Sequence, residues 1–197
     1  MAVGLVPVDA PLVNLGDINR GTWPEEFRPK SATAFSWVMN NYWHTNYQRV
    51  QTGDYTFRYI LTSGSTLTPE SLARLGRDAM TPLEAGALIS NDKFDNPARP
   101  LTPAPTSFLQ VDAPNVALEN WKTAEDGHGT IVRLLEIAGQ AATVHLQFPL
   151  FELKQAWLAN ALEENQREIP VSAHSLEVPI QPHQVLTIRI LALWPPR

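Results

Sequence analysis

Alternating apolar and polar residues predict that much of the second half of the chain is β-strand. In residues 142–148, apolar side chains at even positions alternate with Thr143, His145 and Gln147. Because successive side chains of a strand point to opposite faces, one face of this strand is expected to be buried. The last run, residues 185–194, places Thr187 and Arg189 opposite its apolar positions. Further strands are predicted at 33–40, 55–62, 108–111, 116–123, 130–137 and 175–180.

Turn residues and one capped segment complete this pattern. Residues 126–129, Asp-Gly-His-Gly, predict a tight hairpin, since glycine accepts the positive φ of such turns. Residues 138–140, Ala-Gly-Gln, predict a second hairpin. One helix is predicted from Pro69 to about Met80. Thr68 is a suitable N-cap, proline suits the first helical position, and apolar residues form one stripe along the segment.

A proline-rich segment divides the predicted elements into two groups. Residues 95–106 contain four prolines and no apolar periodicity, which is typical of an extended linker. We predict a partial β-sheet segment with an aromatic loop and the short helix in residues 1–94, and a β-sandwich in residues 107–197. Residues 151–167 have helical propensity but are interpreted as a strand followed by a polar loop. The expected fold class is mainly β, an antiparallel β-sandwich.

Composition narrows the classes of function. The chain has 15 Lys and Arg against 20 Asp and Glu, a formal net charge of −5, so it offers no general attraction for nucleic acid or an anionic membrane. It contains no cysteine, which excludes disulfides, thiolate zinc sites and thiol nucleophiles. No apolar run reaches the length of a membrane-spanning helix. We expect a soluble protein, with the bacterial cytoplasm as its expected location.

The candidate binding residues lie in an aromatic and amide-rich stretch, residues 36–51. Aromatic faces can contact the C–H groups of sugars, and planar amides can bind sugar hydroxyls. Asn41, Trp43, Asn46 and Tyr47 have this chemistry and are the predicted carbohydrate-binding residues. The alternative is that the aromatic side chains fill a core or an interdomain seam while the asparagines satisfy turn backbones. The residues alone leave both interpretations open.

No catalytic or metal-binding residue is predicted. Glycoside hydrolysis needs two carboxyl groups ~5 to 9.5 Å apart across the scissile bond, and sequence neighbours rarely face each other in that way. We therefore expect solvated loops at the three adjacent carboxylate pairs, which are Glu25 with Glu26, Glu125 with Asp126, and Glu163 with Glu164. The five histidines lack the spacing of metal ligands, and no phosphate-binding or nucleophile motif is present.

Three segments point to a known family. Val38 to Gly64, VMNNYWHTNYQRVQTGDYTFRYILTSG, has an Asn-Asn-Tyr-Trp run before a Phe-Arg-Tyr strand. In Ala117 to Phe148, ALENWKTAEDGHGTIVRLLEIAGQAATVHLQF, a Glu-Asp-Gly-His-Gly turn leads into an Arg-Leu-Leu-Glu strand. The third segment is VPIQPHQVLTIRI, residues 178–190. In this order the segments resemble the C-terminal region of glycoside hydrolase family 38, the α-mannosidases. The resemblance spans nearly the whole chain and implies an antiparallel β-sandwich of the galactose-mutarotase-like, supersandwich type.

The resemblance also implies that the chain is part of a longer enzyme. Family members hold the catalytic zinc, the aspartate nucleophile and the acid/base in an N-terminal domain, and none of those motifs can be placed here. We therefore expect no cofactor in this chain, with zinc in the catalytic domain. The expected function is a non-catalytic C-terminal β domain of an α-mannosidase-like hydrolase, which packs on the catalytic domain and contributes to carbohydrate binding. The alternative is a free-standing carbohydrate-binding β-sandwich module.

Overall fold

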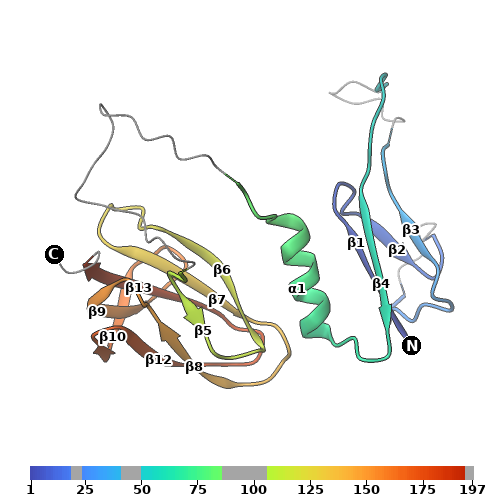
Figure 1. The fold of residues 1–197 in the computed structure, drawn as a ribbon. Helices are drawn as coiled ribbons and strands as arrows, with labels where there is room; N and C mark the ends of the chain where they lie inside the picture. The colour runs from blue at the N-terminus through green and yellow to red at the C-terminus, as the bar shows by residue number, and fades with distance from the viewer. Residues whose placement is uncertain (19–23, 41–49, 86–105, 194–197) are drawn as a thin grey trace. The chain divides into compact units, whose positions relative to one another are not determined.

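The computed structural model describes residues 1–18, 24–40, 50–85 and 106–193, and its strands and helix are drawn in Figure 1. The chain consists of two units, Met1–Leu83 and Glu84–Arg197. Of the predicted linker, residues 95–106, only Thr106 lies within the described residues, so the domain boundaries drawn from the sequence stay a prediction. Within the described ranges, no helix reaches the length and apolar character that a bilayer crossing requires.

The second unit is an antiparallel β-sandwich (Figure 1). One sheet has five strands in the order β10-β9-β13-β7-β6, and the other has four in the order β11-β12-β8-β5. The bounds are β5 Gln110–Val111, β6 Val116–Thr123, β7 Thr130–Glu136, β8 Ala142–Gln147, β9 Glu152–Ala159, β10 Asn165–Ile169, β11 Val171–Ser172, β12 Ser175–Ile180 and β13 Val185–Leu193. The predicted fold class, a mainly β antiparallel sandwich, is confirmed.

Apolar side chains from both sheets meet in one core. Along β8 and the residue after it, Val144, Leu146 and Phe148 are fully buried, while the polar residues between them are exposed. The five-stranded sheet contributes β-branched and leucine side chains to the same cluster, including Val132 and Ile188. The alternation predicted for residues 142–148 is therefore confirmed, and the apolar face of β8 is the face that packs against the opposite sheet.

The strand β13 is buried on both of its faces. It lies between β9 and β7, and its Ile188 and Ile190 belong to the core. Thr187 and Arg189, on the opposite face, are only 5% and 7% exposed. A central strand that is covered on both sides must therefore accommodate an arginine, and the contacts that do so form part of the candidate site described below.

Several predicted elements agree closely with the structure. Residues 116–123 and 175–180 coincide with β6 and β12, and 130–137 and 185–194 correspond to β7 and β13. Residues 126–129 form the hairpin between β6 and β7, with positive φ at Gly127 and Gly129. An added Cβ at Gly129 would lie 2.5 Å from the Ile190 carbonyl oxygen, so this position requires glycine for space as well as for conformation.

Two expectations for the second unit are wrong in part. Residues 138–140 were expected to form a hairpin, but they join β7 of one sheet to β8 of the other, although Gly139 does have a positive φ of 73°. Residues 151–167 contain the predicted strand, β9, but the expected polar loop ends early because β10 begins at Asn165. β10 is an edge strand whose first four residues are exposed, so it has no apolar alternation to reveal it.

The first unit contains two small antiparallel pairs. β1 (Ala2–Pro7) pairs with β4 (Tyr59–Gly64), and β2 (Val13–Leu15) pairs with β3 (Ala34–Ser36). The predicted strand 55–62 therefore starts four residues late. The backbone N–H and guanidinium of Arg58 instead donate hydrogen bonds to the Asp9 carboxylate at 2.7–2.9 Å. The predicted strand 33–40 shortens to the three residues of β3.

The helix prediction is confirmed in detail. α1 spans Pro69–Met80, and Thr68 is its N-cap. The Thr68 hydroxyl accepts a hydrogen bond from the Ser71 backbone N–H at 3.2 Å, while the Ser71 hydroxyl accepts one from the Thr68 N–H at 2.9 Å. This reciprocal pair satisfies two backbone donors that the first turn of a helix leaves without partners.

We expect Leu146→Ala to lower the free energy of unfolding of the second unit by about 2–5 kcal/mol, because Leu146 is fully buried and its truncation leaves a cavity. Leu162→Ala removes the same atoms from a side chain that is 78% exposed, and should change stability by less than ~0.5 kcal/mol. Urea denaturation followed by circular dichroism measures both. Equal losses in the two variants would contradict the placement of β8 in the core.

Candidate functional site

Three cationic side chains lie on the outer face of the five-stranded sheet. Lys122 of β6 and Arg189 of β13 are both register partners of Ile131 in β7, so they occupy one row across the sheet. Arg133 lies two residues further along β7, on the same face. Two acidic residues from turns, Asp126 and Glu163, pair with these cations. We call these five residues the Arg189 cluster.

Glu163 is the buried carboxylate of the Arg189 cluster. Its side chain is 3% exposed, lies 2.8 Å from the Lys122 ammonium and 3.3 Å from the Arg133 guanidinium, and accepts a hydrogen bond from the Glu125 backbone N–H at 2.8 Å. The Lys122 hydrogen bond and the Glu125 N–H hold the pKa of Glu163 below its usual value, against the opposing effect of burial. The carboxylate is therefore ionised at neutral pH, and its oxygens are already held by Lys122, Arg133 and the Glu125 N–H.

The turn between β9 and β10 positions Glu163. The Asn160 side-chain oxygen accepts hydrogen bonds from the backbone N–H groups of Leu162 and Glu164, both at 2.9 Å, and the Glu163 N–H donates to the Asn160 carbonyl. Glu163 has a φ of 67°, a backbone conformation that residues other than glycine and asparagine rarely adopt. The contacts of its carboxylate with Lys122 and Arg133 offset this backbone strain.

Arg189 connects two turns to the central strand. Its Nη1 donates to both carboxylate oxygens of Asp126, at 2.9 and 2.7 Å, and to the His128 carbonyl at 2.9 Å. Its Nη2 donates to the Glu163 carbonyl at 2.6 Å. The His128 N–H and Arg189 both lower the pKa of Asp126, which is half-exposed. Arg189 Nε is buried without a hydrogen-bond partner in the described part of the chain.

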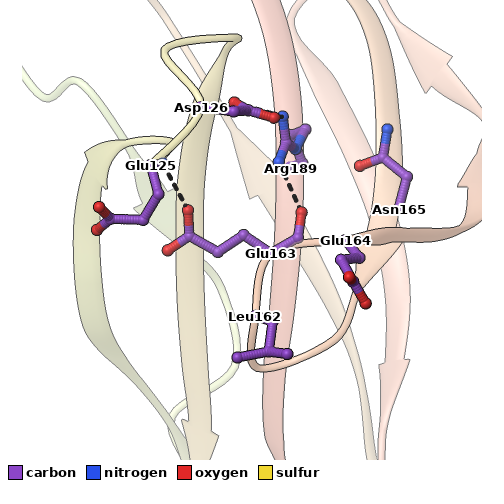
Figure 2. Close-up of a pocket in the computed structure, with 7 residues that line it drawn as sticks. All are labelled: Glu125, Asp126, Leu162, Glu163, Glu164, Asn165 and Arg189. Carbon is purple, nitrogen blue, oxygen red and sulfur yellow. Dashed lines mark hydrogen bonds and ion pairs between the residues drawn. The ribbon is translucent and has the colours of Figure 1, made fainter.

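A pocket of about 350 Å³ opens beside this cluster (Figure 2). Leu162, Asn165 and Arg189 line it. Four carboxylate residues complete the lining: Glu125, Asp126, Glu163 and Glu164. A glycosidase site needs one carboxyl group whose raised pKa lets it donate a proton. Asp126 and Glu163 have lowered pKa values and hold cations, so neither is suited to that role. The pocket contains carboxylates that stabilise turns.

The expectation of solvated loops is correct for some carboxylates and wrong for one. Glu25, Glu26 and Glu164 are exposed, and the Glu125 side chain is 81% exposed beside Lys122. Glu163 is the exception, because the positive-φ turn directs it onto the sheet where two cations meet it. Among the described residues, no group of three or more His, Asp or Glu side chains is arranged to hold a metal ion.

Glu136 is a second buried carboxylate and closes the other end of the sandwich. It is fully buried at the end of β7 and accepts hydrogen bonds from the backbone N–H groups of Ala138, Gly139 and His183, at 2.7–2.9 Å. The Asn115 amide donates a fourth at 2.8 Å. Burial alone raises the pKa of Glu136, but hydrogen bonds from the His183 and Ala138 backbones, the Asn115 amide and the Gln140 backbone outweigh it and lower the pKa to about 2. One carboxylate thus fixes three connecting segments.

An apolar pocket of about 500 Å³ is lined by Ser107, Phe108, Leu109, Leu118, Trp121 and Phe151. Its rings are close to one another but not parallel. The centroids of Trp121 and Phe151 are 5.7 Å apart with the ring planes inclined by 40°, and Phe108 and Phe151 are inclined by 46°. Tilted packing of this kind is typical of aromatic side chains that pack on one another.

The predicted carbohydrate-binding residues, Asn41, Trp43, Asn46 and Tyr47, lie outside the described residues, so their role stays a prediction. The structural roles of Glu136, Glu163 and Arg189 were not predicted from the sequence. For Arg189 a signal was present, since an arginine between isoleucines in a long apolar strand predicts a charge that must find partners. No comparable signal marked Glu163, whose burial depends on a turn conformation.

Comparison with known families identifies the sandwich. Residues 115–188 match the family model described as "Glycosyl hydrolases family 38 C-terminal beta sandwich domain". This segment is similar to the C-terminal β-sandwich domain of glycosyl hydrolase family 38. The resemblance stated from the sequence is thereby confirmed for this part of the chain, which is less than half of its 197 residues. No curated protein matches the chain.

The family 38 match covers the strands from β6 to the middle of β13. Four members of the Arg189 cluster, Lys122, Asp126, Arg133 and Glu163, lie inside the matched segment, and so does Glu136. Arg189 follows its last residue directly. Most of the paired charges therefore lie in the part of the chain that matches the family 38 C-terminal sandwich model.

We expect Glu163→Gln to lower the free energy of unfolding at pH 7, because a neutral amide leaves Lys122 and Arg133 without their buried counter-charge. Glu164→Gln is the matched control. Glu164 is the next residue, its side chain is exposed, and glutamine keeps an oxygen that can accept the hydrogen bond from the Asn160 amide. Thermal denaturation compares the two. A loss of stability as large in the control would show that the Lys122 and Arg133 contacts are not what stabilises the turn.

We expect Glu136 to make the sandwich sensitive to acid. Its pKa is about 2 in the folded chain and near the ordinary 4.5 when unfolded, so its stabilisation is present above about pH 4.5 and is lost as the pH falls toward 2. The difference in unfolding free energy between the native chain and Glu136→Gln should shrink over this range in urea titrations. Glu168→Gln, at an exposed position of β10, should show no such dependence. A constant difference would argue against a lowered pKa.

Proposed function

We propose that this chain is the non-catalytic C-terminal β region of an α-mannosidase-like family 38 hydrolase, and that it packs on the catalytic domain of that enzyme. The observation on which the proposal rests is the family 38 C-terminal domain match over residues 115–188. The catalytic domain would hold the zinc ion and the reactive carboxylates. The chemistry of the second unit supports this division, since Asp126 and Glu163 of its acidic pocket have lowered pKa values and pair with Arg189 and Lys122.

The first unit supports the packing part of the proposal. Among its described residues only Gly4 and Ala10 are buried, whereas apolar side chains of both small sheets are exposed. Val3 of β1 is 63% exposed and Leu61 of β4 is 71% exposed. Contiguous apolar surface of this kind marks sites of association with another protein surface. An independent binding module would be expected to bury such a face within itself.

The alternative function is a free-standing carbohydrate-binding sandwich. A flat platform of aromatic side chains would favour it, since sugar rings stack on coplanar faces. The rings of the apolar pocket are inclined by 40° and 46° to one another, and so provide no common plane. We therefore place the carbohydrate contact in the first interpretation, where Asn41, Trp43, Asn46 and Tyr47 belong to the rim of the sugar site.

We expect the isolated chain to hydrolyse no p-nitrophenyl α-mannoside, with or without added zinc, because the reacting groups belong to the catalytic domain. Mixed with a family 38 catalytic domain whose own C-terminal β region has been deleted, the chain should elute as a one-to-one complex in size-exclusion chromatography with light scattering. Turnover by the isolated chain would exclude the proposal. Saturable binding of α-mannobiose in calorimetry, without complex formation, would support the carbohydrate-binding module instead.

A further inference from the structure

A further pocket of the sandwich lies on the outer face of the five-stranded sheet, close to the Arg189 cluster. Its volume is about 350 Å³, which is within the range of small-molecule sites. Its floor is one row of side chains across three strands, because Thr187 of β13 is the register partner of Arg133 in β7 and of Ala159 in β9. We call it the Thr187 pocket.

The Thr187 hydroxyl has no partner at the floor of this pocket. Thr187 is only 5% exposed, and within residues 106–193 its hydroxyl takes part in no hydrogen bond. Among the described residues, the side-chain atom that is sealed from solvent without a partner is Arg189 Nε, so the Thr187 hydroxyl is open to the pocket and is not enclosed by protein. Polar groups of such buried residues normally have partners, so this hydroxyl indicates an occupant of the pocket.

The other free polar groups around the hydroxyl are mainly hydrogen-bond donors. Arg133 uses only its Nη2, which donates to the Ala161 carbonyl at 2.9 Å and to the Glu163 carboxylate at 3.3 Å. Its Nε and Nη1 have no acceptor among the described residues. The Gln184 side-chain oxygen already accepts a hydrogen bond from the Gln181 N–H at 2.8 Å, which leaves its NH₂ group. A ligand must therefore supply acceptor oxygens.

A β-bulge brings one more polar side chain to the pocket. The register of β10 against β9 shifts between Asn165 and Arg167, so Gln166 is the extra residue of the strand. A bulge changes the direction of a side chain, and bulges are frequent beside functional sites. Gln166 lines the pocket, and its amide makes no hydrogen bond within residues 106–193. This amide can therefore bind a ligand without losing a contact inside the protein.

The balance of charge under the pocket favours an anion. Lys122 and Arg133 share the buried carboxylate of Glu163, at 2.8 and 3.3 Å. The other carboxylate beside Lys122 belongs to Glu125, whose side chain is 81% exposed, so water screens its charge. A second carboxylate can accept hydrogen bonds from the Arg133 guanidinium and from the Thr187 hydroxyl, and charge-assisted hydrogen bonds of this kind are the strong ones.

Apolar side chains complete the lining. Val185, at the start of β13, is 59% exposed, and Leu158 and Ala161 line the same pocket. We propose that the Thr187 pocket binds a small organic carboxylate, with the carboxylate group on Arg133 and Thr187 and its apolar body against Val185 and Leu158. The site uses residues of the second unit alone, so it does not depend on the proposed function.

Titration of the full chain with sodium propionate, hexanoate or benzoate, followed by proton–nitrogen correlation NMR, tests this assignment. At least one of these carboxylates should produce saturable shifts of the Gln166, Gln184 and Thr187 backbone amides. The corresponding neutral amides, propionamide, hexanamide and benzamide, have almost the same shape and should bind about tenfold more weakly. Equal binding of acid and amide would overturn the carboxylate assignment. If no carboxylate shifts these signals, the pocket holds only water and the proposal is wrong.

A matched pair of charge variants locates the site. Gln184→Glu keeps an oxygen that can accept from the Gln181 N–H, but it replaces the free NH₂ donor by a negative oxygen. This variant should weaken carboxylate binding by about tenfold or more. Gln147→Glu makes the same change of charge at an exposed position of β8, in the other sheet, and should leave the affinity unchanged. An equal loss in both variants would show a general effect of charge and contradict the site.

Thr187→Val tests the hydroxyl, because it replaces the hydroxyl by a methyl group of similar shape. It should weaken carboxylate binding by about fivefold. Thr187→Ser keeps the hydroxyl and should restore most of the affinity. Circular dichroism verifies that both variants fold. A folded Thr187→Val variant with native affinity would overturn the proposal, and if this variant does not fold, the comparison of Gln184→Glu with Gln147→Glu decides.

Discussion

The second unit depends on burying both faces of its central strand, β13. One face supplies Ile188 and Ile190 to the core, and the other contains Arg189, which is only 7% exposed. A buried guanidinium is costly unless its donors find acceptors. Asp126, the His128 carbonyl and the Glu163 carbonyl provide them, and all three belong to turns. The position of two surface turns is thus a consequence of placing an arginine in the middle of a sheet.

Buried carboxylates hold turns in place at two positions in the sandwich. At one end Glu163 and Asp126 meet cations of three strands, and at the other Glu136 accepts hydrogen bonds from three turn amides and from Asn115. The chain has no cysteine, so no disulfide can fix these connections. Charged side chains that form hydrogen bonds and ion pairs with the turns perform that task instead. In the second unit, this network explains why carboxylates line a pocket without having the properties of a catalytic pair.

The two units differ in how completely they bury their apolar side chains. The sandwich encloses a core and pairs its buried charges, and Arg189 Nε is the buried side-chain atom among the described residues that lacks a partner. In the first unit, Leu72 of α1 lies against Gly4 on one face of the β1–β4 pair, and Val3 and Leu61 on the other face are exposed. The sandwich therefore buries its own apolar face and pairs most of its buried polar groups, whereas the described part of the first unit leaves apolar side chains exposed.

The sequence by itself determined the elements whose information is local. The alternation in residues 142–148 required a strand with one buried face, Thr68 and Pro69 required a helix start, and the glycines of 126–129 required a hairpin. Only the tertiary structure decided that residues 138–140 cross between sheets, that β10 is a strand, and that Glu163 is buried. Each of these depends on partners distant in sequence: the opposite sheet, the neighbouring β9, and the cations Lys122 and Arg133. The local sequence pattern indicates which apolar residues prefer to be buried. The pairing of strands distant in sequence decides which charged residues are buried beside them.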